Sequence, residues 1–216
     1  MLPKQASLFD LDGTLLKVNS SFCFGKYLYQ QGFFSLFQLL QLATISVLHK
    51  IGFVSIESVH HSVFKKIFRG RCSKQVEQFA DQFVETYFNS MLYSPAIDRL
   101  KQAQSANHFV AILSSSPDFI VKRFVQKFEV LHCESSIYAV DSNGLYSHIE
   151  HLVEGQVKAA WVTRAIEESL VGFEETTAYT DSDIDLPFLL SCGTKVIVNP
   201  TRRLRAIGLK NHWEII

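Results

Sequence analysis

Two clusters of aspartates are the residues of this sequence best suited to chemistry. Asp10 and Asp12 stand two positions apart after a short apolar run, and Gly13 lets the chain leave that run in a tight turn. The second cluster contains Asp181, Asp183 and Asp185. Carboxylates this close repel one another unless a cation or a shared proton relieves the repulsion. Together the clusters indicate one site for a hard cation, and a few oxygen ligands suit Mg²⁺ better than Zn²⁺.

Both clusters also fit a simpler interpretation. Asp12 or Thr14 could cap the helix that follows the first cluster, and the second cluster could cap a helix over residues 186–190. An EF-hand is excluded for the second cluster, because the glycine and the terminal glutamate of that loop are missing.

A run of serines and one lysine are the next candidates. Ser114 and Ser115 end another apolar run, and a hydroxyl beside the backbone N–H groups of a helix start can hold an anion. An ordinary helix start with Pro117 in its first turn explains these serines equally well. Lys158 follows Gly155 at the beginning of a further helical stretch, where a solvated face is the usual place for a lysine.

The apolar runs that carry these residues predict a sheet. The expected strands are 6–9, 109–113, 136–140, 176–179 and 195–198, and helical stretches such as 119–128 and 157–170 lie between them. Strands that alternate with helices indicate an α/β fold with a Rossmann-like parallel sheet covered on both faces. Ligands bind beyond the carboxyl ends of the strands in such a sheet, which is where the candidate residues stand.

The gap between the first two strands is too long for one crossover helix. Residues 17–92 predict an inserted all-helical cap, which Gly32, Gly52 and Gly70 divide into about four helices. This segment holds 11 of the 18 phenylalanines and eight basic against four acidic residues. Residues 1–16 and 93–216 form the expected core domain.

The overall composition is that of an ordinary globular protein. The 216 residues include 21 basic and 21 acidic side chains, so the net charge gives no reason to expect a nucleic-acid partner. The four cysteines are widely spaced, which predicts neither a zinc site nor a disulfide framework. No signal peptide is indicated at the N-terminus, and we expect a cytoplasmic protein.

Taken in order, these motifs resemble the haloacid dehalogenase superfamily, and specifically its phosphoserine-phosphatase-like branch, subfamily IB. The matching segments are Phe9-Asp10-Leu11-Asp12-Gly13-Thr14-Leu15, Ser114, Lys158 and Asp181-Ser182-x-x-Asp185-Leu186-Pro187. The turn Asn143-Gly144-Leu145-Tyr146 and the segment Val198-Asn199-Pro200 are also similar to this branch. The resemblance covers nearly the whole chain, although residues 17–92 match only in position and helical character.

The resemblance implies a Mg²⁺-dependent phosphatase that works through an aspartyl phosphate. Asp10 would be the nucleophile, and Asp12 would protonate the leaving oxygen and then activate water. The implied metal ligands are Asp10, Asp12 through its backbone carbonyl, Asp181 and Asp185. The last of these would orient Lys158 or a metal-bound water.

The resemblance also implies which residues meet the substrate. Ser114 and Ser115, with Lys158, would hold and neutralise the phosphoryl oxygens. Thr14 would steady the first loop by a hydrogen bond. Asn19 stands where phosphoserine-specific relatives carry a glutamate for the substrate's ammonium group. A neutral amide cannot pair with a cation, so phosphoserine itself is a doubtful substrate.

The 23 residues from 27 to 49 contain no charged side chain. Considered as one helical stretch, they show a polar stripe, composed of Gln31, Ser35, Gln38 and Gln41, on an otherwise apolar surface. One interpretation is a cap helix buried against its neighbours. The other is a helix at a membrane interface, where nearby basic residues would meet anionic headgroups. A phospholipid phosphomonoester would suit the second interpretation, as in phosphatidylglycerophosphatases of this branch, and would make the protein membrane-associated.

The substrate class therefore stays open between a small phosphorylated metabolite and a phospholipid phosphomonoester. Two functions other than hydrolysis also stay open. The chain could transfer the phosphoryl group to an acceptor other than water, or it could bind a phosphorylated ligand without catalysis. The oligomeric state is not indicated by the sequence.

Overall fold

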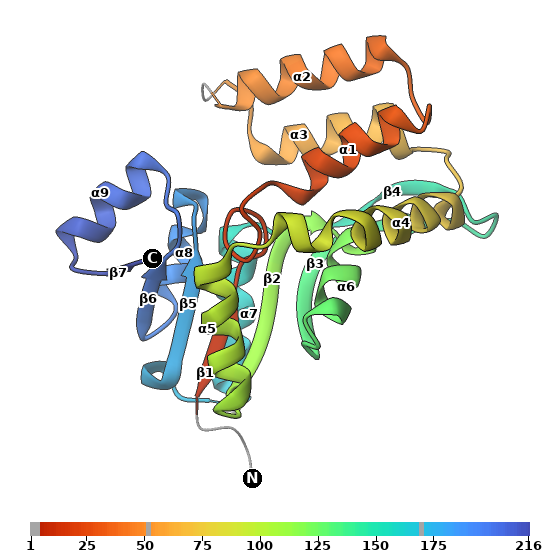
Figure 1. The fold of residues 1–216 in the computed structure, drawn as a ribbon. Helices are drawn as coiled ribbons and strands as arrows, with labels where there is room; N and C mark the ends of the chain where they lie inside the picture. Colours follow the sequence, from red (N-terminus) through yellow and green to blue (C-terminus); the bar gives the residue numbers. More distant parts are fainter. Residues whose placement is uncertain (1–4, 51–52, 169–170) are drawn as a thin grey trace.

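The computed structural model describes residues 5–50, 53–168 and 171–216 and shows a mostly parallel sheet with helices on both faces (Figure 1). Within those residues the strands are β1 (Ala6–Phe9), β2 (Phe109–Pro117), β3 (His132–Val140), β4 (Tyr146–His151), β5 (Thr176–Thr180), β6 (Thr194–Ile197) and β7 (Glu214–Ile215). Their order is β4-β3-β2-β1-β5-β6-β7, and the β3–β4 pair alone is antiparallel in this sheet. The predicted α/β fold is confirmed.

The helices fall into two sets along the chain (Figure 1). Between β1 and β2 come α1 (Ser20–Gln30), α2 (Leu36–Lys50), α3 (Ile56–Val63), the π-helical turn Phe64–Phe68, α4 (Ser73–Met91) and α5 (Ser94–Ser105). The sheet's remaining crossovers contain α6 (Asp118–Lys127), α7 (Gly155–Glu167), α8 (Leu186–Leu190) and α9 (Arg202–Lys210). Short 3₁₀ turns cover Phe173–Glu175 and Asp183–Asp185.

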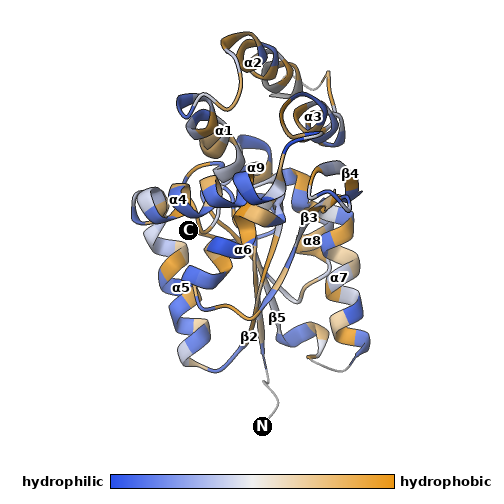
Figure 2. Cartoon of the chain, turned by 90° about the vertical axis from the view of Figure 1, so that its right-hand side faces the viewer, coloured by the Kyte–Doolittle hydropathy of each residue, from blue (hydrophilic) through white to orange (hydrophobic). Residues whose placement is uncertain are grey.

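Alternation along the central strands produces two apolar layers. Leu8 and Ala111 point to the face covered by α7, α8 and α9, where they join a cluster that includes Phe188. Phe9 and Ile112 point to the opposite face and join the cluster under α5, α6 and the inserted helices. Figure 2 shows α5 and α7 on opposite sides of the sheet. The centre of the sheet is therefore covered by apolar side chains on both faces. This close packing holds the strand ends in fixed positions.

The inserted helices differ from the sequence prediction in one respect. The stretch from 27 to 49 is two helices, because α1 ends at Gln30 and α2 begins at Leu36. Gly32 has a φ of +70°, and its N–H donates to the carbonyl of Tyr29, which closes the end of α1. The interpretation of this stretch as one helix was therefore wrong. None of the helices in the described ranges is long and apolar enough to cross a membrane.

The helix α4 joins the inserted helices to the core. It packs on α6, and two ion pairs link these helices, Asp81–Arg123 at 2.6 Å and Glu85–Lys127 at 2.5 Å. The chain then enters α5, whose first turn contains Pro95.

Candidate active site

The site lies where β1, β2 and β5 end. Strand β1 is hydrogen-bonded to β2 on one side and to β5 on the other, so the segments that follow these three strands meet. Asp10 is the first residue after β1, and its N–H donates to the carbonyl of Tyr179 in β5 at 2.9 Å. Its side chain is thus fixed at the carboxyl edge of the sheet, where α/β proteins bind their ligands.

Lys158 and two aspartates form a buried triad. The Nζ atom of Lys158 lies 2.7 Å from Asp10 Oδ1 and 2.7 Å from Asp185 Oδ2. Lys158 is only 1% exposed, so it does not lie on a solvated face. Thr180 donates its hydroxyl to Asp185 Oδ2 at 2.9 Å. The triad therefore holds the ammonium group of Lys158 directly against Asp10.

Gly155 makes this placement of Lys158 sterically feasible. A Cβ atom at position 155 would lie 2.3 Å from the backbone oxygen of Ile184. Only glycine allows the first turn of α7 to approach the Asp183–Asp185 turn this closely. As a result, Lys158 in α7 reaches Asp185 and Asp10.

The charges of the triad shift one another's pKa values. Burial raises the pKa of Asp10 well above its usual range, Lys158 opposes this rise, and the nearby charges of Asp185 and Asp181 add to it. Burial by itself would lower the pKa of Lys158, but Asp10 and Asp185 outweigh burial and raise it. Lys158 is therefore a permanent cation in a site that has several carboxylates around it.

Asp181 lies against the loop that follows Asp10. Gly13 in this loop has a φ of +82°, and a Cβ there would lie 2.2 Å from Asp181 Oδ2. The two aspartate clusters are thus in contact, as predicted. Burial, together with the charge of Asp185, raises the pKa of Asp181 to about 7.

Two hydrogen bonds link Asp12 to β2 and to α1. Its Oδ1 accepts from the backbone N–H of Ser20 at 2.6 Å, and its Oδ2 accepts from the hydroxyl of Ser116 at 2.5 Å. The hydroxyl of Ser21 lies 2.6 Å from that of Ser116. Burial raises the pKa of Asp12, and the hydrogen bonds from Ser116 and Ser20 oppose the rise. The sequence interpretation missed Ser20, Ser21 and Ser116; the third serine of the Ser114–Ser116 run was the available signal.

Hydrogen bonds hold the serine turn that the sequence suggested as an anion cradle. Ser114 is fully buried, and its Oγ accepts from the N–H of Ser116 at 3.2 Å. The carbonyl of Ser115 accepts from the hydroxyl of Ser136 at 2.7 Å. Ser136 in turn accepts from the N–H of Val153 at 3.0 Å, so β3 and the segment before α7 both fix this turn. The serines thus lie beside Asp12 at the start of α6.

Two predicted substrate residues have different surroundings from those expected. The hydroxyl of Thr14 is buried and has no hydrogen-bond partner among the described residues, so the hydrogen bond expected to steady the first loop is not seen there. Asn19 is exposed and caps α1, because its Oδ1 accepts from the N–H of Phe22 at 2.8 Å. Asp183 points away from the triad toward Thr201 and Arg203, at 3.0 and 3.3 Å.

The donors at this site fit Mg²⁺. Burial, together with the charges of neighbouring aspartates, raises the pKa values of Asp10 and Asp181, so a bound cation would stabilise their ionised forms. Among the described residues no three carboxylate, histidine or cysteine side chains form a ready-made metal cluster. Asp185 is engaged by Lys158, and Asp12 by Ser116. Two carboxylates, a backbone carbonyl and water are nevertheless a usual Mg²⁺ ligand set.

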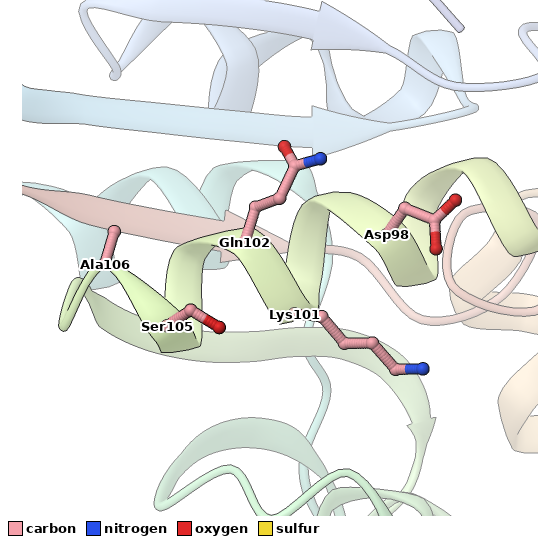
Figure 3. A pocket seen from close by; sticks show the side chains of 5 residues that line it. All are labelled: Asp98, Lys101, Gln102, Ser105 and Ala106. Atoms are coloured by element: carbon pink, nitrogen blue, oxygen red, sulfur yellow. The ribbon is translucent and has the colours of Figure 1, made fainter.

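A surface depression elsewhere on the core is separate from this site. It is lined by Asp98, Lys101, Gln102, Ser105 and Ala106 (Figure 3). All five residues belong to α5 or directly follow it, and none of them is hydrogen-bonded or ion-paired to Asp10, Lys158 or Asp185. We assign it no role in the chemistry.

The chain belongs to the haloacid dehalogenase-like hydrolase family, which it matches over residues 7–190. This range contains every residue of the triad, the aspartate clusters and the serine run. The superfamily predicted from the sequence motifs is thereby confirmed.

Curated relatives are distant but cover most of the chain. The inhibition of morphological differentiation protein of Streptomyces azureus is 24% identical over 100% of this chain and 79% of its own length. A phosphoserine phosphatase of Mycobacterium tuberculosis is 23% identical over 97% of this chain and 70% of its own length.

Solved structures share the fold. A protein of unknown function from Bordetella pertussis Tohama I has a TM-score of 0.87 at 18% identity, covering 99% of this chain and 98% of that one. A substrate-bound phosphoserine phosphatase has a TM-score of 0.68 at 16% identity, covering 94% and 90%. The predicted resemblance to the phosphoserine-phosphatase-like branch is therefore confirmed at the level of the fold.

Proposed function

We propose that this hydrolase is a phosphatase that cleaves phosphomonoesters through an aspartyl phosphate on Asp10. The observation that supports this most is the contact between Asp10 and Lys158, at 2.7 Å in a buried site. Lys158 engages Oδ1, so Oδ2 is the oxygen that would attack phosphorus. A lysine fixed beside the nucleophile would also neutralise the incoming phosphoryl group.

In the first step, Asp10 Oδ2 forms a bond to phosphorus while the bond to the ester oxygen breaks. Asp12 gives its proton to that leaving oxygen. The raised pKa of Asp12 favours its protonated form, which suits this role. Ser114, Ser115 and Lys158 hold the phosphoryl oxygens.

In the second step, water attacks the phosphorus of the aspartyl phosphate. Asp12, now ionised, takes a proton from the water, and the bond between Asp10 and phosphorus breaks to release inorganic phosphate. Asp185 acts as a positioning residue, because it fixes Lys158 at 2.7 Å. Protons balance over the full cycle, because Asp12 gives one proton to the leaving oxygen and regains one from water.

Mg²⁺ would be held by Asp10, the backbone carbonyl of Asp12 and Asp181, and would offset the negative charge of nucleophile and phosphate. Gly13 keeps Asp181 close to this loop. The hydroxyl of Thr14, in the loop that also contains Asp12 and Gly13, is buried without a partner among the described residues.

Residues 17–92 are proposed as the cap, and residues 1–16 and 93–216 as the catalytic core. The cap would choose the substrate, because two residues at the start of α1 connect it to Asp12: Ser20 directly through its N–H, and Ser21 through the hydroxyl of Ser116. We favour a small phosphorylated metabolite or a phospholipid phosphomonoester that lacks an ammonium group at the Asn19 position. The Mycobacterium relative is named a phosphoserine phosphatase. Phosphoserine carries an ammonium group, so it is the substrate that tests whether such a group is excluded at the Asn19 position.

The test is phosphate release from a panel of monoesters with and without Mg²⁺. The panel contains phosphoserine, sugar phosphates, nucleoside monophosphates and phosphatidylglycerophosphate in micelles. Release that requires both Mg²⁺ and Asp10 supports the proposal, and the best substrate separates metabolite from lipid. A phosphorylated acceptor formed in place of free phosphate would indicate transfer. Tight binding of a phosphorylated ligand without turnover would indicate a binding protein.

A further inference from the structure

Helix α2 directs two glutamines toward the protein. Gln38 donates to the backbone oxygen of Lys66 at 2.7 Å, and Gln41 accepts from Lys66 Nζ at 2.6 Å. Leu39 and Leu42 on the same side pack on the edge of the core cluster. The inner side of α2 therefore mixes polar and apolar residues, whereas an amphipathic helix of a globular protein normally keeps its polar residues on the solvent side.

The opposite side of α2 exposes large apolar side chains. Phe37 is 69% exposed and Leu40 is 58% exposed, and Leu36 and Leu48 are exposed on the same helix. Positions 36, 37, 40 and 48 fall on one stripe, since residues three and four apart share a helix face. Phe53, 80% exposed, extends the stripe because its N–H donates to the carbonyl of Leu48.

This stripe, called here the α2 surface, faces away from the rest of the molecule. Helix α2 is the outermost element above the strand ends, with α1 and α3 between it and the core (Figure 1). Figure 2 shows the same position and the strongly apolar colouring of α2. Contiguous exposed apolar residues on an outer edge mark an interaction surface.

The segment that carries the α2 surface is mostly basic. Residues 17–76 contain eight basic residues, and Glu57 is their one acidic residue. The next acids, on α4, include Asp81 and Glu85, which pair with Arg123 and Lys127 of the core. Two acids of the inserted segment are therefore neutralised on the core side, and the outer helices keep a positive charge.

We propose that the α2 surface docks on an anionic membrane, with α2 lying in the plane of the interface. The apolar side chains would enter the boundary between headgroups and acyl chains, and the basic residues around them would meet anionic headgroups. A second copy of this chain fits less well, because two positive surfaces would face each other. Docking of the α2 surface on a membrane is independent of the proposed phosphatase reaction, because docking requires no turnover.

The experiment is sedimentation of the protein with vesicles of phosphatidylcholine, with and without phosphatidylglycerol. The wild type is expected to pellet with the anionic vesicles at low salt and to be released by high salt, because salt screens the electrostatic attraction. For the variant Phe37→Ser/Leu40→Ser, the lipid concentration that binds half of the protein is expected to rise at least about tenfold for each side chain removed. Phe53→Ser, outside the helix, should weaken binding in the same direction.

Leu131→Ser is the matched control. Leu131 is 90% exposed and precedes β3, at the amino ends of the strands and opposite α2. This variant should bind as the wild type does, and thermal melting should confirm that all variants are folded. Wild-type protein that stays in the supernatant with anionic vesicles, or that binds equally well after both α2 substitutions, would overturn the proposal. A wild-type dimer that the α2 variant loses in analytical ultracentrifugation would assign the surface to a second copy instead.

Discussion

Ser116 donates its hydroxyl to Asp12 Oδ2 at 2.5 Å. The hydroxyl of Ser21, on α1, lies 2.6 Å from that of Ser116. Since the hydrogen of Ser116 is directed to Asp12, Ser21 must donate to Ser116. A chain of two hydroxyls therefore connects the first inserted helix to the carboxylate proposed as the acid and base.

Removal of the Ser116 hydroxyl should impair the protonation step more than the attack step. A hydrogen bond to a charged group contributes about 1.5–3 kcal/mol, so Ser116→Ala should lower kcat/KM for alkyl phosphates about 10- to 100-fold. The loss should be smaller for p-nitrophenyl phosphate, whose leaving group needs no proton. Ser147→Ala, on β4, is the control and should behave as wild type. Equal losses on both substrates would show that Ser116 does not act through Asp12.

Gly155→Ala should disturb the contact between Lys158 and Asp10. The added methyl group would lie 2.3 Å from the backbone oxygen of Ile184 and would push α7 outward. We expect a loss of about 1–3 kcal/mol in the free energy of unfolding and a lower kcat. Gly25→Ala in α1 is the matched control, because a Cβ there meets no atom within 4 Å. Its expected effect is a gain of about 0.5–1 kcal/mol. The interpretation of Gly155 would be wrong if both variants melted at the same temperature.

Mg²⁺ should raise the melting temperature, because a bound cation would offset the burial and the mutual repulsion that raise the pKa values of Asp10 and Asp181. A Mg²⁺ concentration of 100 times Kd corresponds to about 2.7 kcal/mol of stabilisation. Asp181→Asn should strongly reduce the rise in melting temperature that Mg²⁺ causes. Asp183→Asn removes the same charge from an aspartate that points toward Thr201, so it should keep the shift. A full Mg²⁺ shift in Asp181→Asn would remove Asp181 from the metal site.

Stability should fall in mild acid because of His60. Burial, and then the charge of His61, lowers the pKa of His60 from 6.5 to about 4. The unfolded chain therefore binds a proton between pH 6.5 and 4 that the folded chain does not. The contribution of neutral His60 to the free energy of unfolding is complete above pH 6.5 and is lost as the pH falls toward 4. At pH 5 the loss is about 2 kcal/mol. Urea unfolding at pH 7.5 and 5 measures this difference.

His60→Gln should lose most of that pH dependence, whereas His61→Gln should keep most of it, since the His61 side chain is largely exposed. His60 Nδ1 lies 3.3 Å from the hydroxyl of Tyr138, so the amide of glutamine can replace the polar contact. An unchanged acid sensitivity in His60→Gln would assign the effect to other groups.

The core of the fold could be predicted because its strands are short apolar runs that end in polar turns. The strand 6–9 was predicted with the boundaries that β1 has, and β5 differs by one residue. Strands β4 and β7 were missed. β4 has the sequence Tyr-Ser-His-Ile-Glu-His, with little apolar alternation, and β7 has two residues. The division of 27–49 into two helices was also missed, because hydropathy alone does not show where Gly32 takes a positive φ.

The site could be predicted in part, for a physical reason. Asp10, Lys158 and Asp185 stand at strand or helix ends, where α/β topology brings distant residues together. The partners of Asp12 on α1 could not be found in this way. Ser116, although 104 residues from Asp12, lies at the end of β2 and could have been found from the serine run. The contacts of Ser20 and Ser21 depend on how the inserted helices pack, and local patterns carry no information about that packing.

The central claim is that Asp10 carries the phosphoryl group during turnover. The direct measurement is a rapid acid quench of the enzyme with its best substrate and Mg²⁺, followed by mass spectrometry of the peptide that contains Asp10. We predict one phosphoryl group on Asp10 in the wild type, and neither this adduct nor phosphate release in Asp10→Asn. Steady turnover with the adduct on another residue, or undiminished turnover in Asp10→Asn, would contradict the account.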